Sequence, residues 1–174
     1  GLVADVPAAM AAALAEAFDR LVFAEDVRVS DQSTSIRQYA VVGGRAADVL
    51  ARAMGVAGEA VRGLPLWSQL DVDAGFVVRT DDAHEGSWDV LVDARAADAV
   101  IAALEKAGAV PASGDVLEAM RIDAGRPAFG VDMTGDTIPL EAGLLERAIS
   151  QTKGCYVGQE VIIRVLHRGG GRVA

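Results

Sequence analysis

The sequence predicts an α+β fold in which antiparallel sheets pack against helices, including a ferredoxin-like subdomain. Between about residues 27 and 108, segments with strand alternation and segments with helical spacing follow the order strand, helix, strand, strand, helix. This order makes up most of a split β-α-β unit, with the helices on one face of an antiparallel sheet. Helical patterns flank the unit, and no apolar run reaches the roughly 18 residues that a membrane span needs.

The N-terminal segment predicts an amphipathic helix. Asp5 is expected to cap the helix, and Pro7 falls in its first turn, where proline is favoured. Its apolar face consists of Leu14, Phe18, Leu21 and Val22. Residues 25–29 alternate between polar and apolar side chains and predict a short strand, followed by a polar loop.

Residues 36–42 predict the next strand, and a helix follows it as far as Gly55. Gly43 and Gly44 lie between the two, a position that invites comparison with phosphate-binding loops. The glycines match neither common phosphate-loop pattern, so we interpret them as a structural turn. Residues 55–74 show no clear period and are expected to be irregular.

Two further strands, residues 75–79 and 88–92, predict a hairpin with a long polar turn. Residues 94–107 predict a helix that ends at Gly108. The side chains expected to face inward are Ala97, Val100, Ile101 and Leu104.

A boundary is expected at residues 111–114, after which a short helix spans residues 113–124. Leu117 and Met120 should lie on its buried side. Farther on, Pro139 is expected to fix a turn before a helix-like run. That run contains Leu144, Leu145 and Ile149.

The 174-residue chain is acidic, with a formal net charge of -9, which argues against nonspecific binding to nucleic acid or to anionic membranes. Its last part is the exception, because residues 153–174 carry four Lys or Arg side chains and a single acid, Glu160. An anionic ligand would be attracted there, although a basic tail that folds onto an acidic body is an equal alternative. With one cysteine and no recognisable signal peptide, a soluble, cytoplasmic protein is expected.

That cysteine, Cys155, lies in the stretch Lys-Gly-Cys-Tyr-Val-Gly-Gln-Glu, residues 153–160. The glycines suggest a turn, and the apolar spacing that follows predicts a helix. A thiol just ahead of a helix start, with Lys153 nearby, is favoured as thiolate and is therefore reactive. The alternative is that Cys155 is a small buried hydrophobic residue without chemistry.

Other polar residues are interpreted as solvated. His84 has no second histidine or cysteine at a metal-ligand spacing, so no metal site is expected. The acid pairs Asp71 with Asp73 and Asp81 with Asp82 have no marked catalytic partner.

Four blocks in order resemble the YgfZ branch of the GcvT-like folate-binding superfamily. They are residues 117–127, residues 130–133, residues 138–144 and the cysteine stretch 153–160. Residues 1–110 resemble the family more weakly, so the likeness covers nearly the whole chain. It implies a GcvT/YgfZ-like fold around a central hole that holds tetrahydrofolate. It also implies relatives that are longer, with an N-terminal segment and a C-terminal barrel that this chain is expected to lack.

The resemblance also implies roles for individual residues. Cys155 and Lys153 become the candidate catalytic residues. Asp123 stands where related aminomethyltransferases carry a pteridine-contacting glutamate, so it becomes a candidate folate contact with a shorter reach. The complete candidate set for binding folate is Asp123, Tyr156, Gly158, Gln159, Glu160 and Arg164. Whether the basic residues Arg164, His167, Arg168 and Arg172 face ligand or solvent stays open.

The function implied by the YgfZ branch is a folate-binding accessory protein for assembly or repair of iron-sulfur clusters in client enzymes, such as a tRNA methylthiotransferase. The alternatives are an aminomethyltransferase that transfers a one-carbon unit to tetrahydrofolate, and a non-catalytic interaction module. A folate-lining domain is expected from residues 1–24 and 113–174, and a ferredoxin-like subdomain from residues 25–112. The expected partners are folate and iron-sulfur proteins, with no direct nucleic acid, no membrane and a monomeric state.

Overall fold

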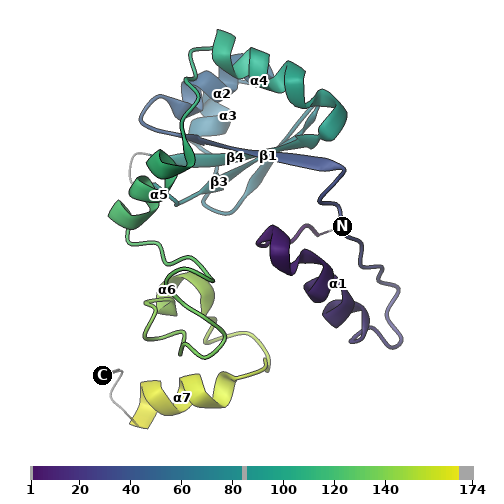
Figure 1. The fold of residues 1–174 in the computed structure, drawn as a ribbon, viewed down its shortest axis with the longest axis vertical. Coiled ribbons are helices and arrows are strands. Elements are labelled where there is room, and N and C mark those ends of the chain that lie inside the picture. The colour runs from purple at the N-terminus through teal and green to yellow at the C-terminus, as the bar shows by residue number, and fades with distance from the viewer. Residues whose placement is uncertain (1, 84–85, 169–174) are drawn as a thin grey trace. The chain divides into compact units, whose positions relative to one another are not determined.

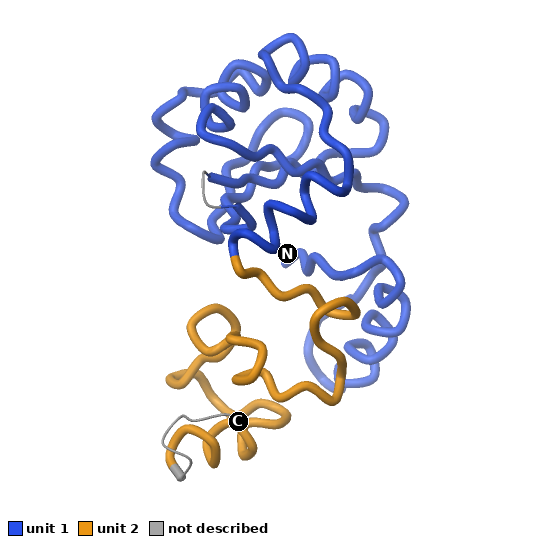
Figure 2. The backbone as a smooth tube through the Cα atoms, turned by 60° about the vertical axis from the view of Figure 1, so that its left-hand side comes forward, with its two compact units in different colours: residues 1–124 blue, residues 125–174 orange. Residues whose placement is uncertain are grey.

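A computed structural model describes residues 2–83 and 86–168 of the chain. Two compact units are distinguished in Figure 2, Gly1–Ala124 and Gly125–Ala174, and each is described by itself. The discontinuous folate-lining domain expected from the sequence stays a prediction. His84 and Arg172 lie outside the described residues.

The first unit is built on a four-stranded sheet in the order β1-β4-β3-β2, with every neighbouring pair antiparallel. Its strands are β1 (Ile36–Val42), β2 (Gln69–Val72), β3 (Gly75–Thr80) and β4 (Ser87–Asp93). Because β4 is antiparallel to both β1 and β3, these two run parallel to each other on either side of it. The α+β class and the split unit predicted from the sequence are therefore confirmed, with β2 as an additional edge strand.

Helices cover one face of this sheet (Figure 1). They are α2 (Ala46–Met54), α3 (Gly58–Arg62) and α4 (Ala97–Lys106), the last preceded by a short 3-10 turn, η2 (Ala94–Ala96). Leu50 and Val61 of the helices, with Val77 and Val90 of the strands, are fully buried between the two layers. This layer is the hydrophobic core of the unit, and its burial is the main source of stability.

The helix ends follow the predicted signals. Gly55 ends α2 in a left-handed conformation, and its N–H donates to the carbonyl of Ala51. Gly108 follows α4 with a φ of +103°. One inward assignment is wrong, because Ile101 is 36% exposed. The side of α4 that packs on the core carries Val100, which is buried, so the next residue, Ile101, lies on the flank of the helix.

The N-terminal helix is present but starts later than predicted. A 3-10 turn, η1 (Ala8–Met10), precedes α1 (Ala11–Asp19), and no side chain caps either start. Asp5 is therefore not an N-cap, and it accepts a hydrogen bond from the Gln38 side chain instead. The helix buries none of its residues, so Phe18 and other apolar side chains remain exposed.

Two predictions for the connecting segments are wrong. Residues 25–29 form no strand, since an alternating pattern needs a neighbouring strand to pair with, and Glu25 instead accepts hydrogen bonds from the backbone N–H groups of Phe23 and Ala24. Residues 55–74 are more regular than predicted, because they contain α3 and β2. Both elements are too short for their periods to stand out in the sequence.

The helix predicted over residues 113–124 is α5 (Gly114–Asp123). Its expected burial is wrong at Leu117, which is 38% exposed, while Met120 is half-buried. None of the residues of α5 is fully buried, so its apolar side chains extend the exposed apolar surface of the first unit.

The second unit has little regular structure before its last helix. Backbone hydrogen bonds form successive turns over residues 138–143, around Pro139, as expected. They lead to α6 (Leu145–Ala148), a shorter helix than the predicted run. After the cysteine stretch comes α7 (Gln159–Arg168), in which the side chain of Ile162 is buried.

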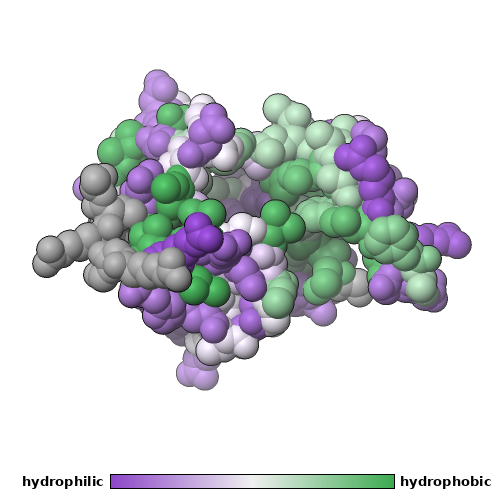
Figure 3. Space-filling model, turned by 90° about the horizontal axis from the view of Figure 1, so that it is seen from below, coloured by the Kyte–Doolittle hydropathy of each residue, from purple (hydrophilic) through white to green (hydrophobic). Residues whose placement is uncertain are grey.

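Exposed hydrophobic side chains occur in both units, and Figure 3 shows green, hydrophobic residues on the face that it displays. Within the described ranges, no helix is both long and apolar enough to cross a membrane.

Candidate functional site

The cysteine stretch forms a tight turn directly before α7, as the sequence predicts. Gly158, the residue before the helix, has a φ of +84°, a conformation that suits glycine and strains other residues. The backbone N–H of Tyr156 donates to Oε1 of Gln159 at 3.1 Å. Gln159 therefore ties the turn to the first residue of the helix, a structural role that the resemblance does not assign to it.

Lys153 and Tyr156 also contact each other. The Lys153 ammonium nitrogen lies 5.1 Å from the centre of the Tyr156 ring, within the range of a cation–π interaction. The half-buried Tyr156 thus gives the lysine a fixed partner inside the motif.

Cys155 is a free, exposed cysteine, so the alternative of a small buried hydrophobic residue is wrong. Val157, two residues later, is fully exposed. Gly158 and Gln159 shape the turn, and Lys153 packs on Tyr156, while the thiol remains accessible. The arrangement can present a thiol to a partner or ligand, and its role as a catalytic residue stays a prediction.

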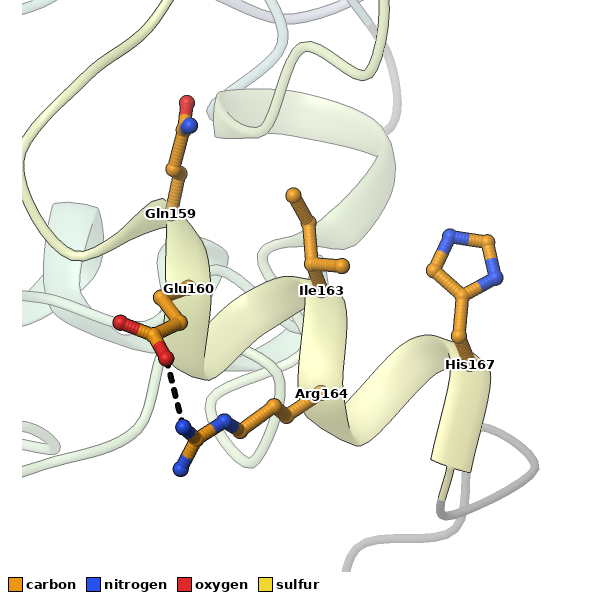
Figure 4. A pocket seen from close by; sticks show the side chains of 5 residues that line it. All are labelled: Gln159, Glu160, Ile163, Arg164 and His167. Atoms are coloured by element: carbon orange, nitrogen blue, oxygen red, sulfur yellow. Dashed lines mark hydrogen bonds and ion pairs between the residues drawn. The ribbon is translucent and has the colours of Figure 1, made fainter.

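Along α7, a surface hollow of about 470 Å³ is lined by Gln159, Glu160, Ile163, Arg164 and His167. In Figure 4, Gln159, Ile163 and His167 form one row, and Glu160 and Arg164 form the other. Nη2 of Arg164 lies 2.5 Å from Oε1 of Glu160, and both side chains are largely exposed. Arg164 is therefore balanced by a carboxylate, and a ligand anion would have to compete with Glu160 for it.

Asp123 is the last residue of α5 and is exposed, followed by the buried Ala124. Two turns of the same helix are tied by Arg121, whose Nε donates to Glu118 at 2.8 Å. Asp123 belongs to the first unit and the cysteine stretch to the second, so their roles in one folate site remain predictions.

In the part of the chain that the structure describes, no three His, Cys, Asp or Glu side chains gather in a way that could hold a metal ion.

Sequence reasoning missed one polar cluster in the first unit. Asp89 lies in the middle of β4, where Gln38 and Asp5 approach it. Burial is the main cause that raises the pKa of Asp89 to about 6; the hydrogen bond from Gln38 opposes the rise, and the nearby carboxylates Asp82 and Asp5 add to it. The available signal was an acid inside the apolar strand Trp-Asp-Val-Leu-Val.

Comparison with known proteins decides the family. Residues 4–153 match the GCVT N-terminal domain. The chain belongs to this family. The GcvT-like resemblance is thereby confirmed at the level of the superfamily. The match ends at Lys153, so Cys155 and the rest of its motif lie beyond the matched residues of the GCVT domain.

Similar curated proteins are named aminomethyltransferases. The chain is 32% identical to that of Moorella thermoacetica over 143 residues, which is 78% of this chain and 38% of the relative. It is 27% identical to that of Corynebacterium aurimucosum over 146 residues, 79% of this chain and 39% of the relative. With a Nostoc protein it shares 33% identity over 89 residues, 51% of this chain and 24% of the relative. The GCVT-type chain thus spans well under half the length of these relatives.

Proposed function

We propose that this chain is the tetrahydrofolate-binding part of an aminomethyltransferase-type protein. The observation that carries the proposal is the match of residues 4–153 to the GCVT N-terminal domain, together with relatives named aminomethyltransferase. In such a reaction tetrahydrofolate accepts a one-carbon unit, and the residues of the chain bind and orient it.

Asp123 is the residue of the first unit best suited to hold folate. A carboxylate can accept two hydrogen bonds from an aminopyrimidine edge, the group that folate presents. Asp123 is exposed at the end of α5, so its oxygens can be reached from solvent. In the second unit, the exposed edge of α7 offers Glu160 and Arg164 as further polar groups.

Replacing Asp123 with alanine should weaken tetrahydrofolate binding by roughly 30-fold, because a hydrogen bond to a charged group contributes about 2 kcal/mol. Titration calorimetry on the full-length gene product measures this. Asp115→Ala is the matched control, since it removes another exposed acid from the first turn of the same helix. Equal affinity of both variants would exclude Asp123 as the contact, and no binding by the unaltered protein would reject the folate proposal itself.

The second candidate function is the accessory role in assembly or repair of iron-sulfur clusters, as implied by the YgfZ resemblance. It is favoured by the exposed thiol of Cys155 in a shaped turn beyond the GCVT match. A cluster takes four thiolates as a rule, so a single cysteine could contact one only together with a client protein. Aminomethyl transfer, in contrast, requires no cysteine thiol.

A Cys155→Ser substitution in cells separates the two candidates. If the accessory role holds, methylthiolation of tRNA by the client enzyme should fall several-fold, while glycine cleavage stays normal. Serine is close in size to cysteine and Cys155 is exposed, so the fold should be unaffected. Normal methylthiolation in the variant, together with unchanged glycine cleavage, would reject the accessory role and would agree with aminomethyl transfer that needs no thiol.

A further inference from the structure

The sheet of the first unit has a second face, opposite α2 and α4, that carries polar groups. On β4, Val90 and Val92 face the helices and belong to the core, so Asp89 and Leu91, which alternate with them, face the other way. Gln38 of β1 pairs in register with Leu91 and therefore shares this second face. A carboxylate and an amide are thus set side by side on a surface that the core helices do not cover.

The side chain of Gln38 joins two segments that are far apart in the sequence. Its Nε2 donates to Oδ2 of Asp89 at 2.9 Å and to Oδ2 of Asp5 at 2.9 Å. An amide nitrogen has two hydrogens, so this arrangement uses both. Asp5 belongs to the extended segment that precedes η1 and α1. The N-terminal segment is therefore tied to the sheet through one shared amide.

Within residues 2–83 and 86–168, the charges that shift the pKa of Asp89 are of one sign. The two charged groups set against it are carboxylates, Asp5 from the N-terminal segment and Asp82 from the loop after β3. Its neighbours in register, Ala40 on β1 and Val78 on β3, carry no charge. Two ionised carboxylates on one amide repel each other, and a proton on Asp89 removes that repulsion.

We infer that residues 2–24 form a strap that is fastened to the second face of the sheet through Asp5, Gln38 and Asp89, and that loosens when Asp89 loses its proton. When the strap is docked, it brings the charge of Asp5 to Asp89 and helps to cover it, both of which favour the protonated acid. By linkage, the protonated acid favours the docked strap. Docking is therefore strongest at low pH and weakens as the pH rises through about 6, the pKa of Asp89 in the folded protein.

A spin label tests this inference. A cysteine is placed at the exposed Val3 (Val3→Cys) in a Cys155→Ser background, so that it is the one labelled thiol. Paramagnetic broadening of the backbone amides of Gln38 and Ala40 then reports docking. We expect the docking equilibrium to be about threefold more favourable at pH 5.5 than at pH 7.5 if the strap raises the pKa of Asp89 by one unit, to about 6.

Three further variants make the test specific. Asp89→Asn, which resembles the protonated acid in shape, should give strong broadening at both pH values. Gln38→Leu should give weak broadening at both. Asp82→Asn removes a charge without touching the shared amide, so it should keep the pH dependence and shift its midpoint to lower pH. Broadening in the reference protein that does not change with pH, or a pH dependence that survives in Asp89→Asn, would overturn the inference.

Discussion

Replacing Gly75 with alanine is expected to lower the free energy of unfolding by about 3 kcal/mol or more. A Cβ atom at this position would lie 2.0 Å from the carbonyl oxygen of Leu91 and 3.0 Å from Cα of Val92. Both are backbone atoms of β4, the strand between β1 and β3, so neither can move without breaking the sheet. Urea denaturation followed by circular dichroism measures the loss.

Gly108→Ala is the matched control for this prediction. Gly108 has a φ of +103°, and a Cβ there would meet nothing within 4 Å. Its substitution should therefore cost only the backbone strain, about 1 kcal/mol. If both variants lost the same stability, the close approach of β3 to β4 would not be the cause.

The second large effect is expected for Leu50→Ala. Leu50 of α2 is fully buried in the core between the helices and the sheet. Removing three carbon atoms from a packed site leaves a cavity, and such changes cost about 3 kcal/mol. Thermal or urea unfolding measures the effect.

Ile101→Ala on α4 provides the comparison, since that side chain is 36% exposed and its loss should cost about 1 kcal/mol or less. If Ile101→Ala lowered the free energy of unfolding more than Leu50→Ala does, the hydrophobic core of this unit would not be centred on Leu50.

The parts of the fold that could be predicted are those in which period, length and end signals agree. β1, β3 and β4 are strands of six or seven residues rich in β-branched and aromatic side chains, and α2 and α4 run nine and ten residues and end near a glycine. From these five elements the split unit follows, because a parallel pair in such a unit needs a helical crossover.

The remaining parts depended on neighbours that a sequence does not reveal. α3 has five residues and β2 has four, too few for a period to be distinguished. Residues 25–29 have the alternation of a strand but pair with no strand in the described part of the chain. Asp5 resembles a helix cap locally, yet its bond is to Gln38, more than thirty positions away.

The sequence motif of the candidate site could be recognised, but several contacts between its side chains could not be predicted. The turn before α7 follows from its glycines, and the pairing of Glu160 with Arg164 follows from their spacing. The roles of Gln159 as a tie to the Tyr156 backbone, and of Lys153 as a partner of the Tyr156 ring, needed three-dimensional contacts. Asp89 went unnoticed because its importance comes from acids on other segments.

The position of β4 also sets an order of events during folding. It is the last of the four strands in the chain, yet it lies between β1 and β3 and pairs with both. While a ribosome is still synthesising the segment before Ser87, β1 has no strand of this sheet beside it, and only the β2–β3 hairpin can form. We therefore expect the sheet to assemble in a late, cooperative step, with the closure of a long loop as its slow part.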